Sequence, residues 1–226
     1  MKITFLGHAA LSIEIGGIHI LVDPFITGNE MAKTIDISKL KADYILITHA
    51  HQDHILDVEA IAIRTKAKIV SNYEIVTHYN NLKIDGHPMN HGGSWEFDFG
   101  KVTYTNAVHT SSFPDGSYGG QPGGFIIESN EGNIYIAGDT ALTMDMKLIP
   151  MQTKIDLAIL PIGDNFTMGV ESAVIASDFV ECNRVLGYHY DTFGYIEIDH
   201  AKAIQSFKDK NKELILLNIG EEISVN

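Results

Sequence analysis

The chain opens with three short runs in which hydrophobic and polar residues alternate. They span residues 2–7, 10–16 and 18–23. A period of two is typical of β-strands, and the Gly16-Gly17 turn predicts an antiparallel hairpin between the last two runs. Strand-like runs return at residues 94–100, 101–109, 124–129 and 133–139. We expect several of these strands to form antiparallel hairpins.

Other segments place their apolar residues at helical spacing. They span residues 57–65, 72–82, 170–181 and 199–210, and they alternate with apolar runs at 44–48, 68–71, 156–161, 184–189 and 213–219. The whole pattern predicts an α/β protein without the regular strand–helix alternation of a barrel. No repeat or linker composition interrupts it, so we expect a single domain over residues 1–226.

The composition limits the function classes. Hydrophobic residues make up 45% of the 226 residues, which is enough for a sizeable core, and 16 Lys and Arg face 29 Asp and Glu. The net charge of -13 disfavours nucleic acid and anionic membranes as partners. A small-molecule substrate fits this balance better, while the oligomeric state, a homo-oligomer included, stays open.

The single cysteine excludes an intrachain disulfide, and Cys182 is expected to be a buried apolar side chain rather than a nucleophile. His8, Ser12 and Glu14 interrupt the first apolar run, so it does not resemble a signal peptide. No later run reaches the length of a membrane span. We therefore expect a cytoplasmic protein.

The strongest chemical signal is a cluster of potential metal ligands directly after the apolar run 44–48. His49, His51, Asp53 and His54 lie within six residues. One regular helix would point them in several directions, so we expect a loop folded around a centre. Neutral imidazoles and a carboxylate suit Zn²⁺, Mn²⁺ or iron.

Three further ligand-type residues follow strand-like runs elsewhere in the chain. They are His109, Asp139 and His189. Loops at strand ends commonly carry functional side chains, and one short loop cannot surround two metal ions by itself. Any one of these residues alone could be structural, but together they supply ligands from other directions.

These residues, in this order, match the signature of the metallo-β-lactamase superfamily, which is H-x-H-x-D-H followed by a distant His, Asp and His. The chain is also similar, end to end, to a bacterial family of metal-dependent hydrolases related to the L-ascorbate-6-phosphate lactonases. The segments that carry this closer resemblance are GHAALSIE, LVDPFITGN, ITHAHQDH, SWEFDFGKV, AGDTAL, PIGDNFTMG and HYDTF.

The resemblance implies a four-layer αβ/βα sandwich with the site at the edge of two packed sheets. It implies that His49, His51 and His109 hold one divalent ion, Zn²⁺ or Mn²⁺. It further implies that Asp53, His54 and His189 hold a second ion and that Asp139 bridges the two. A hydroxide between the ions would be the nucleophile, and Asp53 would also orient it.

Weaker candidates each have a structural alternative. His8 could contact substrate or a ligand residue, or it could be structural. Asp23 could accept a hydrogen bond from a ligand histidine, or it could form the turn before Pro24. Asp164 and Asn165 are expected to border the pocket, with Asn165 as a substrate contact.

The remaining features do not match the metal set. His19, His78 and His200 are expected to be structural or surface residues, and His87 and His91 could line the pocket mouth. The glycine-rich segment 111–124 lacks a phosphate-binding pattern and would be a lid, a pocket wall or a mobile hairpin.

The leading hypothesis is a hydrolase that acts on a small ester, lactone, amide or phosphate-bearing substrate. A nuclease of this fold is disfavoured by the charge. Iron redox chemistry is disfavoured because relatives of that kind usually have Glu where this chain has His51, and because they need a flavin domain. A non-catalytic metal-binding protein would be favoured by missing ligands, and none is missing.

Overall fold

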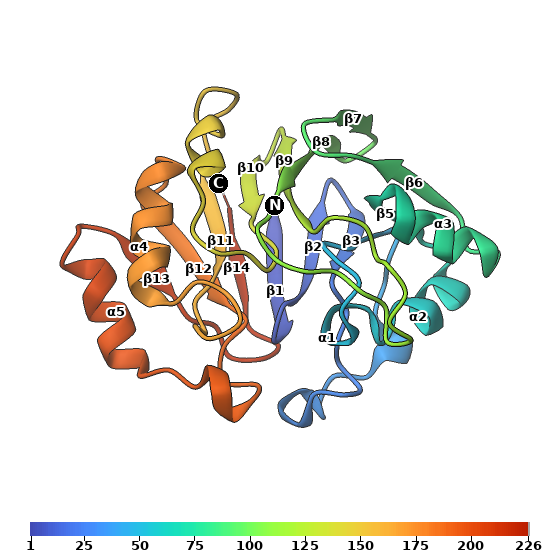
Figure 1. Ribbon diagram of the computed structural model, residues 1–226, viewed down its shortest axis with the longest axis horizontal. Helices are drawn as coiled ribbons and strands as arrows, with labels where there is room; N and C mark the ends of the chain where they lie inside the picture. The colour runs from blue at the N-terminus through green and yellow to red at the C-terminus, as the bar shows by residue number, and fades with distance from the viewer. Residues whose placement is uncertain (226) are drawn as a thin grey trace.

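The computed structural model describes residues 1–225, which form two seven-stranded sheets that face each other (Figure 1). The first sheet contains, in spatial order, β14 (Glu222–Ser224), β1 (Lys2–Gly7), β2 (Ala10–Ile15), β3 (Ile18–Val22), β4 (Tyr44–Leu46), β5 (Lys68–Asn72) and β6 (Gly86–Met89). The second contains β13 (Glu213–Ile215), β12 (Arg184–Tyr188), β11 (Leu157–Pro161), β10 (Gly132–Ile136), β9 (Gly123–Ser129), β8 (Gly100–Asn106) and β7 (Ser94–Phe97). Each half of the chain builds one sheet, except that β14 returns to pair with β1.

Helices cover the outer faces of both sheets. The α-helices are α1 (Gln52–Ile55), α2 (Val58–Thr65), α3 (Tyr73–Asn81), α4 (Val170–Phe179) and α5 (His200–Lys208). Short 3-10 helices are η1 (Glu30–Ala32), η2 (Ile37–Lys39), η3 (Met144–Leu148) and η4 (Gly194–Ile196). Because α2 and α3 pack on the first sheet and α4 and α5 on the second, the layers run helix, sheet, sheet, helix. The predicted αβ/βα sandwich is confirmed.

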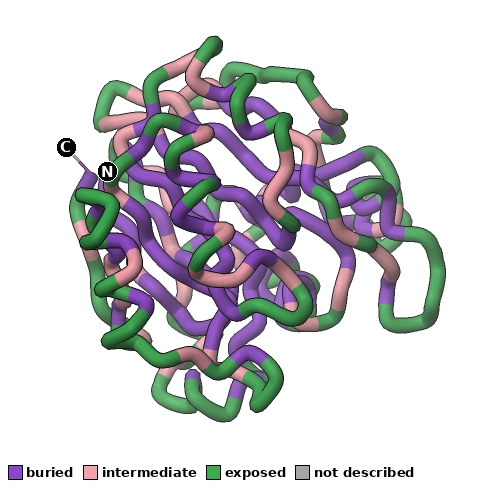
Figure 2. The backbone as a smooth tube through the Cα atoms, turned by 60° about the vertical axis from the view of Figure 1, so that its left-hand side comes forward, coloured by how far each residue is buried: buried purple, intermediate pink, exposed green. Residues whose placement is uncertain are grey.

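The core follows from strand periodicity. In β11, Leu157 and Ile159 join the core between the sheets, whereas Ala158 and Leu160 pack under the helices. A strand buried on both faces needs a continuous apolar run, which is what its sequence shows. Figure 2 shows the same trend, since buried residues follow the strands and exposed residues the outer loops.

The strand directions bring the carboxyl ends of many strands to one edge of the sandwich. Strands β3 to β6 are parallel to one another, and so are β10 to β13. The two sheets are joined at this edge, because the amide of His189 after β12 donates to the carbonyl of His8 after β1 at 2.8 Å. Loops at this edge can therefore combine side chains from both halves of the chain.

Several details differ from the sequence prediction. Residues 52–55 form one turn of helix, so the expectation of a loop throughout 49–54 was wrong there. The edge strand β6 was missed because Gly86 and Pro88 obscure its pattern, and edge positions tolerate proline. The last predicted strand ends at Ile215 rather than at 219, and β14 follows. Within residues 1–225, no helix is long and apolar enough to cross a membrane.

Candidate metal centre

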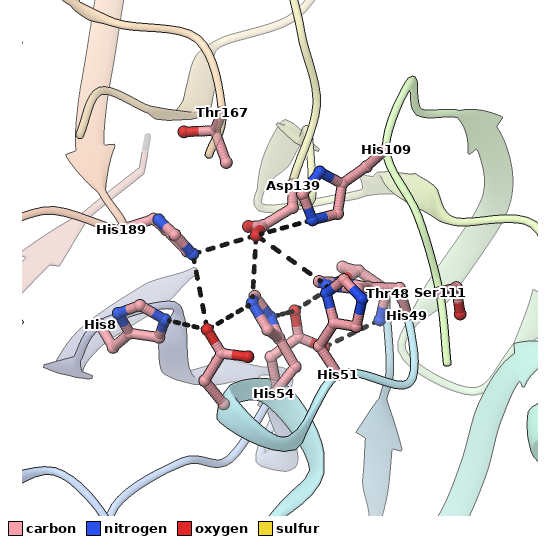
Figure 3. Close-up of polar contacts among 12 residues, drawn as sticks. His8, Thr48, His49, His51, His54, His109, Ser111, Asp139, Thr167 and His189 are labelled. Carbon is pink, nitrogen blue, oxygen red and sulfur yellow. Dashed lines mark hydrogen bonds and ion pairs between the residues drawn. The ribbon is translucent and has the colours of Figure 1, made fainter. Parts of the chain in front are cut away.

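All seven residues of the predicted metal set meet at the edge where the carboxyl ends of the strands lie (Figure 3). His49 follows β4, His109 follows β8, Asp139 follows β10 and His189 follows β12. The single-turn helix α1 adds Asp53 and His54. The centre is therefore assembled from both sheets.

The first group of nitrogen atoms comes from His49, His51 and His109. Their candidate ligand atoms lie within 4.8 Å of one another. His49 Nε2 and His51 Nδ1 are 2.9 Å apart, and His49 is completely buried. The Thr110 hydroxyl lies 3.4 Å from His51 Nε2, on the far side of that ring. The Nδ1 atom of His51 is thus the one that faces the centre.

The second group comes from Asp53, His54 and His189, with His8 beside them. His54 Nε2 and His189 Nε2 both lie 3.9 Å from Asp53 Oδ2. His8 Nε2 lies 3.1 Å from the same oxygen, and His8 Nδ1 lies 2.9 Å from the Thr192 hydroxyl. His8 thus connects a candidate ligand to the loop after β12.

Asp139 stands between the two groups (Figure 3). Its Oδ2 atom lies 3.0 Å from His189 Nε2, 3.4 Å from His54 Nε2, 3.6 Å from His109 Nε2 and 3.9 Å from His49 Nε2. Because one oxygen reaches nitrogens of both groups, this carboxylate has the position that a bridging ligand requires.

Asp23 and Thr48 determine which ring nitrogens carry protons. Asp23 is fully buried, and its Oδ2 accepts from the Thr48 hydroxyl at 2.6 Å and from His54 Nδ1 at 2.8 Å. Since the Thr48 hydroxyl donates to Asp23, its oxygen accepts from His49 Nδ1 at 3.0 Å. In the form that binds metal, both histidines then direct an unprotonated Nε2 at the centre.

Burial and neighbouring charges set the protonation states. Desolvation, reinforced for His49 by His54, lowers the pKa of His49, His51 and His109. Burial would raise the pKa of Asp139, but His189 and His54 hold it well below its usual range. Burial would lower the pKa of His54, but Asp139 and Asp23 raise it well above its usual value, so a metal ion at its Nε2 would displace a proton. The other three imidazoles are neutral beside an ionised carboxylate, which is the state in which these groups bind metals.

The donor atoms fit divalent cations. Two unprotonated nitrogens 2.9 Å apart repel each other unless a cation or a proton lies between them. His54 Nε2, both ring nitrogens of His189 and Asp139 Oδ1 are buried and make no hydrogen bond within the described part of the chain. Unpaired buried polar atoms are costly, and bound cations would remove that cost.

The backbone around the centre is strained. His8, Asp23 and His189 have φ values of 55°, 42° and 55°, in the left-handed region that side chains usually avoid. Each such residue costs about 1 kcal/mol or more, and such residues cluster at functional sites. The strain turns these side chains toward the centre as each strand ends.

The other candidates make no hydrogen bond to the seven residues within the described part of the chain. Asn165 is exposed in the turn between β11 and α4, with φ of 53°, and in residues 1–225 no hydrogen bond joins its side chain to the histidines. His78 stacks on Phe113 with ring centroids 4.0 Å apart, and His91 Nε2 bonds the carbonyl of Pro122. His87 packs on Trp95 at 4.8 Å.

The glycine-rich segment 111–124 is packed against the first sheet. Phe113 is buried, and Asn72 Nδ2 donates to the carbonyls of Gly119 and Gln121. The Ser111 hydroxyl accepts from the amide of Ala50, inside the metal-binding loop. The segment thus forms a wall that supports this loop, one of the alternatives that the sequence left open.

Sequence reasoning missed the roles of Thr48 and Thr192. Thr48 immediately precedes the histidine cluster and orients His49, while Thr192 orients His8. The position of Thr48 next to the cluster was a usable signal. Nothing in the sequence links Thr192 to His8, because the two residues lie at opposite ends of the chain.

Comparisons with known proteins agree with this arrangement. The family described as the beta-lactamase superfamily domain matches residues 2–189. Proteins named UPF0173 metal-dependent hydrolase from Christiangramia forsetii and Flavobacterium johnsoniae are each 69% identical to this chain, and each alignment covers 100% of both proteins. The solved structure of a metallo hydrolase from the archaeon Ignicoccus hospitalis matches with a TM-score of 0.91 and 33% identity, covering 100% of this chain and 98% of that one. All of the site residues lie within the aligned regions.

Proposed function

The chain belongs to the metallo-β-lactamase superfamily and, within it, to the UPF0173 metal-dependent hydrolases. From this premise we propose that its centre holds two divalent ions and hydrolyses a small ester, lactone or phosphate-bearing substrate. The observation that carries the proposal is the position of Asp139. Its Oδ2 atom lies within 3.9 Å of imidazole nitrogens from two separate groups of ligands. A site for a single ion would not need both groups.

In this proposal His49, His51 and His109 hold the first ion. Asp53, His54 and His189 hold the second, and Asp139 contacts both. All are N and O donors that Zn²⁺ and Mn²⁺ accept. The support comes from the grouping of the donor atoms and from the unpaired buried atoms of His54, His189 and Asp139.

Two adjacent divalent ions would lower the pKa of a bound water and would polarise a carbonyl or phosphoryl oxygen. The chain itself positions the groups around that reaction. His8 Nε2 lies 3.1 Å from Asp53 Oδ2 and so holds this carboxylate, which would also orient the attacking water. Asp23 and Thr48 keep His54 and His49 in the tautomer that presents Nε2 to the centre.

The substrate is proposed to be a small molecule rather than a nucleic acid. A net charge of -13 repels long polyanions as they approach. The predicted relation to sugar-phosphate lactonases favours lactones, and it stays a prediction.

Two measurements on one preparation test the proposal. The protein is purified without chelator, its metal content is determined by elemental analysis, and metal-loaded samples are screened on lactones, esters, thioesters, phosphodiesters and β-lactams. We expect close to two ions per chain and turnover of at least one small ester or lactone. No more than one ion per chain after reconstitution would refute the two-metal centre. Cleavage of RNA alone would favour a nuclease.

A further inference from the structure

Two phenylalanine rings flank His8 beside the second group of ligands. Phe25, after β3, and Phe193, after β12, have ring centroids 5.6 Å and 5.3 Å from that of His8 and 6.3 Å from each other. His8 in turn contacts Asp53. The aromatic pair therefore begins one side chain away from a proposed metal ligand.

Both phenylalanines are held on anchored segments. Asp57 accepts hydrogen bonds from the amides of Ile26 and Thr27, which fixes the segment that carries Phe25. On the other side, Asp191 bonds His200 at 2.6 Å and the amide of Ile198 at 2.9 Å. These bonds hold the rings in place before any ligand arrives, which is a property of preformed binding sites.

A second aromatic pair lies on the same segment and on a neighbouring turn. Phe193 is 37% exposed and Tyr195, on the same segment, is 78% exposed. Tyr195 pairs with Phe166 of the neighbouring turn at 6.1 Å, and Phe166 is 52% exposed. Exposed aromatic side chains next to a reactive centre lose water-accessible area when a ligand covers them, so they favour apolar ligands.

The local charges disfavour an anionic substituent. The segments that border the centre contain no Lys or Arg: residues 7–10, 23–32, 49–54, 107–124, 163–169 and 189–199. They contain Asp164 and Glu197, and the first turn of α4 contains Glu171; Lys202 of α5 lines the same cavity as these three, and Lys33 pairs with Glu30. Sites for phosphate groups normally use Arg or Lys, and these segments offer none beside Phe193 and Tyr195.

We infer that the substrate is an uncharged ester or lactone whose aromatic or other apolar group lies against Phe193 and Tyr195. The inference rests on the proposed hydrolase function and narrows its substrate class by removing the phosphate-bearing alternative. Phe193 is then the residue that determines specificity, because it is half covered by His8 and Phe25 and half open.

The test uses the metal-loaded full-length protein and three lactones with one ring. They are γ-butyrolactone, its γ-phenyl derivative and a derivative that bears a phosphate on the same carbon. We expect kcat/KM to be at least about tenfold higher for the phenyl lactone than for the unsubstituted one. The variants Phe193→Leu and Tyr195→Ala should lower kcat/KM for the phenyl lactone about fivefold or more. In each variant the ratio of kcat/KM for the phenyl lactone to kcat/KM for γ-butyrolactone should fall by a similar factor.

The matched control is Trp95→Ala. Trp95 is an aromatic side chain on the edge strand β7, and its exposed fraction of 55% lies between those of Phe193 and Tyr195. The Trp95→Ala variant should behave as the unmodified protein. Elemental analysis of every variant shows whether the metal content is intact.

A binding measurement keeps the two proposals separable. Saturation-transfer NMR with 4-phenylbutyrate should detect contact of the phenyl protons, and Phe193→Leu should weaken that signal while Trp95→Ala does not. If the enzyme hydrolyses none of the three lactones, the proposal that they are substrates is refuted. The NMR result then still decides whether an aromatic group binds at Phe193. Preference for the phosphate lactone, or phenyl binding that is indifferent to Phe193, would overturn the inference.

Discussion

The substitution Asp23→Asn would test how the chain prepares its histidines for metal. Asp23 is fully buried and accepts three hydrogen bonds: from the Thr48 amide at 2.8 Å, from the Thr48 hydroxyl at 2.6 Å and from His54 Nδ1 at 2.8 Å. Asparagine keeps the shape but replaces one acceptor oxygen with a donor. If the NH₂ group takes the position of Oδ1, it faces another donor, the Thr48 amide. If the NH₂ group takes the position of Oδ2, it faces the N–H of His54 Nδ1, which is also a donor.

The second placement would move the His54 proton to Nε2, where it blocks a metal ligand. Loss of such an outer hydrogen-bond partner typically weakens metal binding by about 10–100-fold. That range corresponds to about 1.4–2.7 kcal/mol for the second ion. The metal-free protein should also lose roughly 2–4 kcal/mol in its free energy of unfolding, because a buried hydrogen-bonded carboxylate loses its matched donors.

Asp57→Asn is the matched control. Asp57 is also buried and accepts three hydrogen bonds, from the amides of Ile26 and Thr27 and from the Thr27 hydroxyl, but none from a histidine. Metal affinity is measured by titrating Zn²⁺ or Mn²⁺ into metal-free protein against a chelating indicator, and stability by urea unfolding. Only Asp23→Asn should weaken the second ion, although both variants lose stability. Unchanged affinity in Asp23→Asn, or equal losses in the two variants, would refute the tautomer argument.

Three further predictions follow from the same contacts. Asp139→Ala should lower kcat/KM at least a hundredfold, about 2.7 kcal/mol, and should also lower the metal content. In the control His19→Ala on β3, kcat/KM should stay within twofold of the unmodified protein. Similar losses in the two variants would show that the centre is misassigned. Burial, together with His189, lowers the pKa of His8 from 6.5 to about 4, so neutral His8 stabilises the metal-free protein fully above pH 6.5 and this contribution is lost as the pH falls toward 4. In His8→Gln, the free energy of unfolding in urea should therefore vary with pH by roughly 3 kcal/mol less over that window. Parallel pH curves for the two proteins would contradict this prediction. Gly120→Ala should lower the free energy of unfolding in urea by about 2–3 kcal/mol, because its φ is +75° and a Cβ would lie 2.5 Å from the Asn72 side chain. The control Gly116→Ala, with φ of +83° and open space around it, should lower it by about 1 kcal/mol. Equal losses would mean that Asn72 does not anchor the segment.

The sequence was most informative where a short pattern is under tight chemical constraint. His49, His51, Asp53 and His54 are so closely spaced that few structures other than a metal site would use all four. Hydrophobic periodicity likewise located most strands and helices, since burial on one face or two imposes the pattern directly. It failed at β6, whose pairing with β5 outweighs the weak strand preference of Gly86 and Pro88.

The candidate site could be only partly predicted from the sequence, because contacts between distant residues decide its geometry. The sequence left two alternatives open for Asp23, and the structure shows its carboxylate against His54 Nδ1. Asn165 lies exposed in its turn, and its contact with substrate stays a prediction. Local sequence marks a residue as polar and next to a strand, but it does not fix the direction in which a turn with positive φ points the side chain.

By itself, the sequence singled out the seven candidate ligands and the α/β alternation. The tertiary structure alone decided that Asp139 lies between two groups of histidines, that His8 and Thr192 meet, and that Phe25 and Phe193 form one aromatic surface. The physical reason is that periodicity reports which side of each element is buried. Which elements become neighbours depends on strand pairing and on the packing of two sheets from opposite halves of the chain.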